Sequence, residues 1–228
     1  MADIFNEIEE DIRRDRAARL WRRFGPWVIA LAVLIVLGTA AYVFWQDHRL
    51  KQDQALGNKY SQATALLHSG DNAKAIDALK AITASTSDGY GLLARIEVAS
   101  LQAQGNTQDK AKSGAKADDA SKAAGLAALD SIANDSSIGQ DYRNLARLLW
   151  GLYGVDSLSK AKLTPAIQPL SIAPNPWRFT ATEILALADL RAGDTKGALA
   201  LYKSLADDLD APQSTRARAA ELVTDLQN

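Results

Sequence analysis

Cysteine is absent from the 228 residues, and histidine occurs only twice. Without cysteine, disulfide bridges and thiol chemistry are excluded. His48 and His68 lie twenty residues apart and have no acidic or hydroxyl partner at the spacing of a metal or catalytic site. Glycine-rich phosphate loops, zinc-ligand spacings and nucleophile elbows are also missing. We therefore predict no enzymatic activity, no metal and no cofactor.

The chain also lacks an excess of either charge, because 26 lysines and arginines face 27 aspartates and glutamates. Such a balance provides no basic surface for nucleic acid. Two adjacent acid pairs, Asp118-Asp119 and Asp207-Asp208, point their carboxylates roughly 100° apart on a helix, as on a solvated face. We expect neither nucleic acid nor a small-molecule substrate as a partner.

One long apolar run occupies residues 27–45. Its sequence, WVIALAVLIVLGTAAYVFW, carries no charge. As a helix it spans roughly 28 Å, close to the roughly 30 Å hydrocarbon core of a bilayer. Trp27 at one end, and Tyr42 and Trp45 at the other, suit the headgroup level of a membrane. We predict a single transmembrane helix anchored by these aromatic residues, with Pro26 in its first turn.

A cleaved signal peptide is the alternative, with its apolar core at 28–37 and small residues at 38–40. Two observations favour an uncleaved anchor. Twenty-six residues of mixed charge precede the run, and the run continues past the small residues to Trp45. A buried core helix is a weaker alternative, because it rarely needs so long an uninterrupted apolar stretch.

The orientation of the span follows from basic residues. Six arginines precede it, whereas only Arg49, Lys51 and Lys59 follow it over a similar distance. Acidic residues contribute little to the positive-inside rule, so we predict a cytoplasmic N-terminus and a domain on the far side of the membrane. The topology-determining residues are Arg13, Arg14, Arg16, Arg19, Arg22 and Arg23.

Polar segments flank the span on both sides. The head, residues 1–26, has apolar residues at helical spacing and an acidic block before a basic block. It fits an amphipathic helix that lies on the membrane or on a partner, and equally a solvated helical lead-in to the span. Residues 46–55 are polar and predict a short helical stalk.

Residues 56–228 contain a recurring pattern of helical hairpins. Gly70-Asp71 and Gly193-Asp194 each separate two helical patterns, with the glycine making the turn and the aspartate capping the second helix. After each turn come a small residue, which lets helices approach closely, and two large apolar residues that fill the space between hairpins. These positions hold Ala75, Leu79 and Ile82 in the first unit, and Ala198, Tyr202 and Leu205 in the last.

A middle copy of this pattern is interrupted. Its first helix ends at Gly105, and its second resumes at Ala124 with Gly125 in the small position. The intervening residues 106–122 include no large apolar residue. This composition predicts a flexible exposed loop, or alternatively a partner-binding tail.

Further helical patterns complete the domain. Residues 140–153 predict a helix, and its partner at 163–172 must be short or bent because it contains Pro165 and Pro169. Residues 213–226 predict a polar closing helix. The fold class is therefore all-α: one N-terminal transmembrane helix followed by an α-α superhelix of three to four helical hairpins and a capping helix.

These hairpins resemble tetratricopeptide repeats (TPRs). The turn and packing positions of the repeat hold Gly70, Ala75 and Leu79, and again Gly193, Ala198 and Tyr202. A charged head, one early span and such repeats together resemble the ancillary subunit family of the bacterial SecYEG translocon (YfgM-like). The resemblance implies a single-pass inner-membrane protein with a periplasmic TPR-like domain, whose partners are translocon subunits and a membrane-anchored periplasmic chaperone.

First helices of such repeats line a concave groove suited to a peptide. By repeat phase, the residues expected to face this groove are Tyr60, Arg95, Asn144 and Glu183. Two functions stay open at this point. The first is an adaptor for polypeptides emerging from the translocon. The second is a structural envelope scaffold that coordinates cell-wall or outer-membrane assembly without binding clients.

Overall fold

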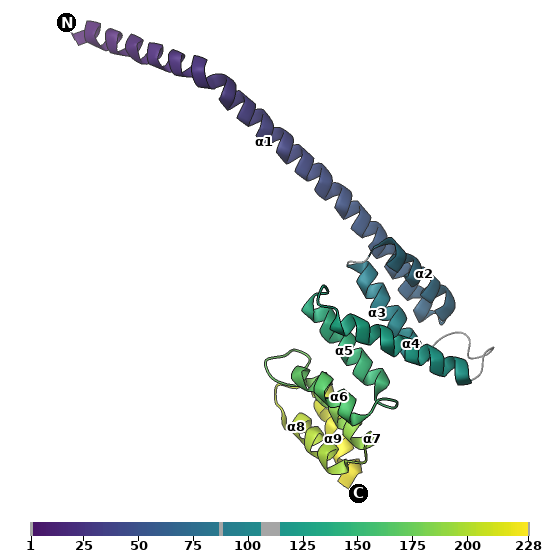
Figure 1. Ribbon diagram of the computed structural model, residues 1–228. Coiled ribbons are helices and arrows are strands. Elements are labelled where there is room, and N and C mark those ends of the chain that lie inside the picture. Colours follow the sequence, from purple (N-terminus) through teal and green to yellow (C-terminus); the bar gives the residue numbers. More distant parts are fainter. Residues whose placement is uncertain (1, 87–88, 106–114, 228) are drawn as a thin grey trace. The chain divides into compact units, whose positions relative to one another are not determined.

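The computed structural model describes residues 2–86, 89–105 and 115–227 (Figure 1). These ranges form nine α-helices and one short 3₁₀ helix, and they contain no strand. The all-α prediction is therefore confirmed. The chain divides into two compact units, Met1–Leu56 and Gly57–Asn228, which are described separately below.

The first unit lies within helix α1 (Ala2–His68), which also supplies the first helix of the second unit. The head, the apolar run and the stalk are all helical. Pro26 lies inside α1, so the prediction that it begins a helix is wrong. An interior proline removes one N–H donor, and the helical residues on both sides maintain the helix across it.

The apolar run of α1 is exposed throughout its described residues. Trp27, Tyr42 and Trp45 are 77%, 59% and 55% exposed, and the Arg49 guanidinium lies 4.6 Å from the centroid of the Trp45 ring. By length and composition, α1 can cross a membrane. Of the six topology-determining arginines, the side chains of Arg13, Arg14, Arg16, Arg19 and Arg22 lie outside the described residues.

The second unit consists of four helical hairpins and a final helix. The end of α1 pairs with α2 (Asn72–Ser85), and α3 (Tyr90–Ala103) pairs with α4 (Ala115–Asn134). The third hairpin joins α5 (Gln140–Gly154) to α6 (Lys160–Ile167) and the 3₁₀ helix η2 (Gln168–Leu170). The last hairpin joins α7 (Arg178–Arg191) to α8 (Thr195–Asp207), and α9 (Gln213–Gln227) packs on α8 as the predicted cap.

The repeat positions recognised in the sequence form the core of each hairpin. The small position is fully buried in all three copies, including Gly125 of α4. The first large position is also buried: Leu79 and Leu129 are 0% exposed and Tyr202 is 1% exposed. The second large position holds Ile82, Ile132 and Leu205, which are at most 3% exposed.

The two Gly-Asp turns have nearly the same backbone conformation. Gly70 and Gly193 have φ values of 83° and 77°, in the left-handed region that favours glycine. Each following aspartate caps the next helix: the Asp71 carboxylate accepts from the Lys74 N–H, and that of Asp194 from the Gly197 N–H at 2.9 Å. The predicted turn and cap are thus both present in each hairpin.

The interrupted middle hairpin differs from expectation. Helix α4 begins at Ala115, so residues 115–122 of the predicted loop are helical. The segment 106–114 lies outside the described residues. Low hydrophobicity misled the prediction, because the sequence AKADDASK is rich in alanine and lysine, which have high helix propensity and extend an already nucleated helix.

The two prolines of the third hairpin have the predicted effect. Helix α6 contains Pro165 and is only 8 residues long, and the 3₁₀ helix η2 follows it with Pro169 in its first turn. This pair of short elements still buries apolar side chains, since Leu163 and Ile167 are 0% exposed and Leu170 is 4% exposed.

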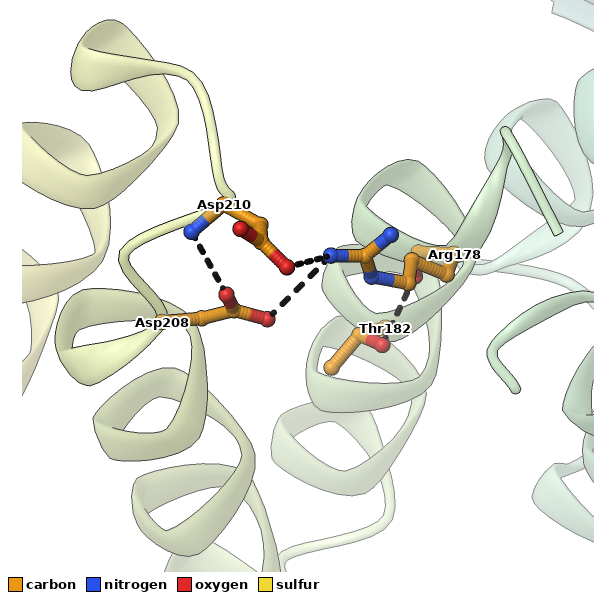
Figure 2. Close-up of polar contacts among 4 residues, drawn as sticks. All are labelled: Arg178, Thr182, Asp208 and Asp210. Carbon is orange, nitrogen blue, oxygen red and sulfur yellow. Dashed lines mark hydrogen bonds and ion pairs between the residues drawn. The ribbon is translucent and has the colours of Figure 1, made fainter. Parts of the chain in front are cut away.

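An ionic contact ties the loop after α8 to the start of α7 (Figure 2). The Arg178 guanidinium lies 3.1 Å from an Asp210 oxygen and 3.8 Å from an Asp208 oxygen. The backbone N–H of Asp210 donates to the other Asp208 oxygen at 2.9 Å, and the Thr182 hydroxyl donates to the Arg178 carbonyl at 2.8 Å. Asp208 therefore helps to hold the loop after α8 against α7.

A second ionic cluster joins the last two hairpins. The Lys160 ammonium lies 2.8 Å from both the buried Asp189 carboxylate and the Asp194 carboxylate that caps α8. A Cβ at Gly197 would approach these two carboxylates to 2.6 and 2.7 Å. A side chain at Gly197, three residues after Asp194, would therefore displace these carboxylates, and the cluster orients α6 against α7 and α8.

We expect Asp194 to make this cluster sensitive to acid. The hydrogen bond from Lys160, followed by that from the Gly197 N–H, lowers the pKa of Asp194. A carboxyl group with a lowered folded-state pKa contributes stability that is complete above its unfolded pKa. That contribution disappears as pH falls through the folded pKa. Urea unfolding of the full-length protein in mild detergent should therefore show a smaller loss of stability on acidification in Asp194→Asn than in the wild type.

The matched control for this prediction is Asp225→Asn, which changes an exposed acid on α9. It should lose stability on acidification as much as the wild type does. Equal acid sensitivity of wild type and Asp194→Asn would contradict the assigned role of Asp194.

Candidate partner-binding surface

Two of the four residues expected in a groove are engaged within the domain. Asn144 is 7% exposed, and its side-chain oxygen accepts a hydrogen bond from Gln140 Nε2 at 2.7 Å. Glu183 on α7 forms an ion pair with Arg218 of α9, with an Nη2–Oε1 distance of 2.6 Å. The first contact lies within α5, and the second joins α7 to α9.

Arg95 and Tyr60 lie in different surroundings from each other. Arg95 on α3 lines a shallow groove together with Lys80 of α2 and Ser131 of α4. Tyr60 at the end of α1 packs against Tyr90 of α3, with ring centroids 5.7 Å apart. Arg95 therefore lies on a different face of the domain from Tyr60, although repeat phase predicted one groove for both.

Glu97, two residues after Arg95, points to the Tyr60 side. Side chains two residues apart on a helix differ in direction by roughly 200°, so Arg95 and Glu97 face opposite sides of α3. Burial raises the pKa of the Glu97 carboxyl group. Burial, and to a lesser extent the Glu97 charge, also raises the pKa values of the Tyr60 and Tyr153 hydroxyl groups. The Glu97 side chain is therefore partly enclosed on this side of α3.

One face of α3 organises these groups. Tyr90, Glu97 and Gln104 follow one another at intervals of seven residues, or about two helical turns, and so share a face. Tyr60 packs on Tyr90 at one end, and Gln104 Nε2 donates to the Tyr153 hydroxyl at 2.9 Å at the other. We call these five residues the α3 surface: Tyr60, Tyr90, Glu97, Gln104 and Tyr153.

The α3 surface joins side chains from the first helices of three consecutive hairpins. Its members are only partly covered, and Tyr90 is 37% exposed. The backbone of α1 approaches this surface closely at Gly57, where an added Cβ would lie 3.0 Å from the Tyr90 hydroxyl oxygen. Tyrosine is enriched at protein–protein interfaces, so this surface is a candidate for binding another protein.

Comparison with known protein families identifies the family of the chain. The profile of the tetratricopeptide repeat-like domain matches residues 19–134, half of the chain. The chain belongs to this TPR-like family. No curated protein and no solved structure matches it significantly. TPR-like domains are typical protein-interaction folds without catalytic function, so protein partners are the expected ligands of this TPR-like domain.

Of the four residues that repeat phase placed in a groove, only Tyr60 belongs to the α3 surface, and Glu97 was not among the four. The signal that identifies it is the seven-residue spacing from Tyr90 through Glu97 to Gln104, which places a charge on an otherwise neutral face. The missing information was the rotation of α3 about its axis. That rotation decides whether Arg95 or Glu97 meets Tyr60.

Chemical sites other than a binding surface receive no support from the described residues. No group of three or more His, Asp or Glu side chains there is placed to hold a metal ion. His48 contacts Gln52 through Nε2 at 3.0 Å, and His68 Nδ1 lies 2.8 Å from the Thr64 carbonyl oxygen. Both histidines thus make local contacts along α1.

A larger cleft lies elsewhere in the TPR-like domain, between α4, α5 and α6. Its volume is about 1000 Å³, with Trp150 and Leu126 among its apolar lining. Asp130, Lys162 and Arg147 also line it, so both charges are present. This mixed lining points to no single ligand chemistry, in contrast to the α3 surface.

Proposed function

We propose that this protein is a single-pass membrane adaptor whose TPR-like domain binds other proteins through the α3 surface. The observation that carries the proposal is the continuity of α1. One helix contains an exposed apolar run long enough to cross a bilayer and ends as the first helix of the repeat domain. The family match also begins before this run and extends through α4. The apolar run and the first repeat helix are therefore parts of one continuous helix.

The proposed location is the bacterial inner membrane, with a cytoplasmic N-terminus and a periplasmic TPR-like domain. The six arginines before the span support this orientation through the positive-inside rule. The natural absence of cysteine allows a direct test, because a single introduced cysteine is the only thiol in the chain. Asn6→Cys places that thiol in the head, and Lys203→Cys places it on the exposed side of α8.

We expect a membrane-impermeant maleimide to label Lys203→Cys in intact spheroplasts and to label Asn6→Cys only after lysis. The cysteine-free parent protein is the control for background labelling. The reverse pattern would overturn the orientation. Release of both variants into the soluble fraction would instead mean that the apolar run is removed or does not span the membrane.

The proposed partners are subunits of the Sec translocon and a membrane-anchored periplasmic chaperone. This part of the proposal is supported by the resemblance of head, span and repeats to the ancillary translocon subunit. A partner surface built from three first helices provides room for an extended or helical segment. The adaptor would hold the chaperone near polypeptides that leave the translocon.

Co-purification from mild detergent tests these partners. The tagged full-length protein should recover translocon subunits, and a variant lacking 27–45 should recover few or none because it is not anchored beside them. Enrichment of one cell-wall or outer-membrane assembly complex, without translocon subunits, would favour the structural scaffold. In that case the TPR-like family would describe the fold but not a role in secretion.

A further inference from the structure

The α3 surface contains a partly buried carboxylate that lacks a counter-charge. Within the described ranges, Glu97 forms no ion pair or hydrogen bond, and partial burial raises the pKa of its carboxyl group. Two other enclosed acids of the domain differ in this respect. Asp189 is paired with Lys160, and Glu183 is paired with Arg218. Enclosing a charge without a partner costs free energy, so a cation from another molecule would be stabilised there.

The side chains around Glu97 favour the same class of ligand. Tyr60 packs against Tyr90, two turns before Glu97, and the Tyr153 hydroxyl accepts a hydrogen bond from Gln104, two turns after it. Tyrosine rings attract ammonium and guanidinium groups through their electron-rich faces. An acidic ligand would be repelled by Glu97, and a purely apolar ligand would bury the carboxylate further without pairing it.

The shape of the surface indicates a polypeptide as the source of this cation. Tyr90, 37% exposed, lies two turns before Glu97 on the same face, and the exposed Gln104 lies two turns after it. An apolar contact, a carboxylate and an amide therefore follow one another along α3. This row matches a chain segment that has an apolar residue, a basic residue and exposed backbone polar groups.

We propose that the α3 surface binds a lysine or arginine side chain of a partner polypeptide, which pairs with Glu97 between Tyr60 and Tyr153. This inference rests on the proposed adaptor function and specifies the chemistry of the segment that is recognised. The bound segment places an apolar residue against Tyr90. Specificity arises because a neutral or acidic residue at the central position leaves Glu97 enclosed and unpaired.

The test uses the full-length protein in detergent micelles and three fluorescent peptides. Each is a water-soluble segment of serine, alanine and leucine with lysine, norleucine or glutamate at its centre. Fluorescence anisotropy should show the lysine peptide binding at least about tenfold more tightly than the other two. Glu97→Gln should remove this preference, and Glu97→Lys should reverse it toward the glutamate peptide.

Two controls separate binding from folding. Glu221→Gln changes an exposed acid of α9 and should leave the lysine preference unchanged. Glu97→Gln keeps the side-chain shape and removes the cost of enclosing a charge, so its thermal unfolding temperature should equal or exceed that of the wild type. Tyr60→Phe retains the ring and should retain the preference, whereas Tyr60→Ala should weaken binding.

Several outcomes would overturn the inference. They are equal affinities for the three peptides, absence of measurable binding to the wild type, and a lysine preference that persists in Glu97→Gln. Failure of this inference is distinguishable from failure of the adaptor function. If Glu97→Gln still co-purifies the same partners as the wild type, the adaptor function stands and recognition uses another surface.

Discussion

Replacing Gly125 by alanine is expected to destabilise the TPR-like domain by about 2 kcal/mol. A Cβ at this position would lie 2.3 Å from the Ala103 nitrogen and 2.5 Å from the Ala99 carbonyl oxygen, both backbone atoms of α3. Such short contacts with backbone force α3 and α4 apart and belong at the upper end of the usual cost of overpacking, about 3 kcal/mol. The gain in helix propensity of about 1 kcal/mol offsets part of this cost and leaves the net loss of about 2 kcal/mol. Urea unfolding of the full-length protein in detergent, followed by circular dichroism, measures the difference.

The neighbouring residue provides a matched control. Ala124 lies on the exposed side of α4, so Ala124→Gly should cost about 1 kcal/mol through helix propensity alone. Because it leaves the contact with α3 intact, hydrogen exchange of α3 amides should stay near the wild-type rate. In Gly125→Ala those amides should exchange faster. A Gly125→Ala protein as stable as the wild type would contradict the close approach of the two helices.

Replacing Tyr202 by alanine is expected to have the largest effect, a loss of about 3–5 kcal/mol. Tyr202 is 1% exposed and packs with Ala186 of α7, Leu205 of α8 and Ala219 of α9. Removing its ring leaves a cavity where three helices meet. Since each repeat contacts mainly its neighbours, α9 should lose its packing first. Urea unfolding gives the total loss, and hydrogen exchange of α9 locates it.

Conservative variants separate the ring of Tyr202 from its hydroxyl. Tyr202→Phe keeps the ring and should cost about 1 kcal/mol or less. Tyr202→Leu introduces the residue that holds the equivalent position in the first and middle hairpins, as Leu79 and Leu129. It should therefore fall between Phe and Ala. If alanine costs no more than phenylalanine, the ring does not support the contact among α7, α8 and α9.

Local chemistry explains why the hairpins were predictable. The turn at Gly70 needs a left-handed backbone conformation, which glycine adopts without steric cost, and Asp71 supplies the oxygen that caps α2. Both requirements concern residues close together in the chain. The spacing of Ala75 and Leu79 likewise reflects a single helix face. Such signals are readable before any tertiary contact is known.

Two local predictions failed because a competing local effect was stronger. Residues 115–122 lack large apolar side chains, but their alanines and lysines extend α4 toward the N-terminus. Proline usually favours a helix start, yet α1 continues through Pro26. In both cases a neighbouring helix continued into a segment whose own composition suggested an interruption.

The proposed partner-binding surface depends on relations between hairpins. Repeat phase placed Tyr60, Arg95, Asn144 and Glu183 together, but the helices turn Asn144 inward and bring Glu183 to Arg218 of the capping helix. Arg95 and Glu97 are both charged and lie two positions apart on α3. Only the packing of α3 against its neighbours determines which of them meets the tyrosines of α1 and α5.

Four features are readable from the amino-acid sequence alone: the helical class, the apolar run at 27–45, the Gly-Asp turns and the buried repeat positions. Each of these follows from backbone conformation or from apolar periodicity within about two helical turns. The tertiary structure decided the pairing of Glu183 with Arg218, the Lys160 cluster and the membership of the α3 surface. These join residues on different helices, and their contacts depend on helix rotation and crossing, which side-chain packing sets across the whole domain.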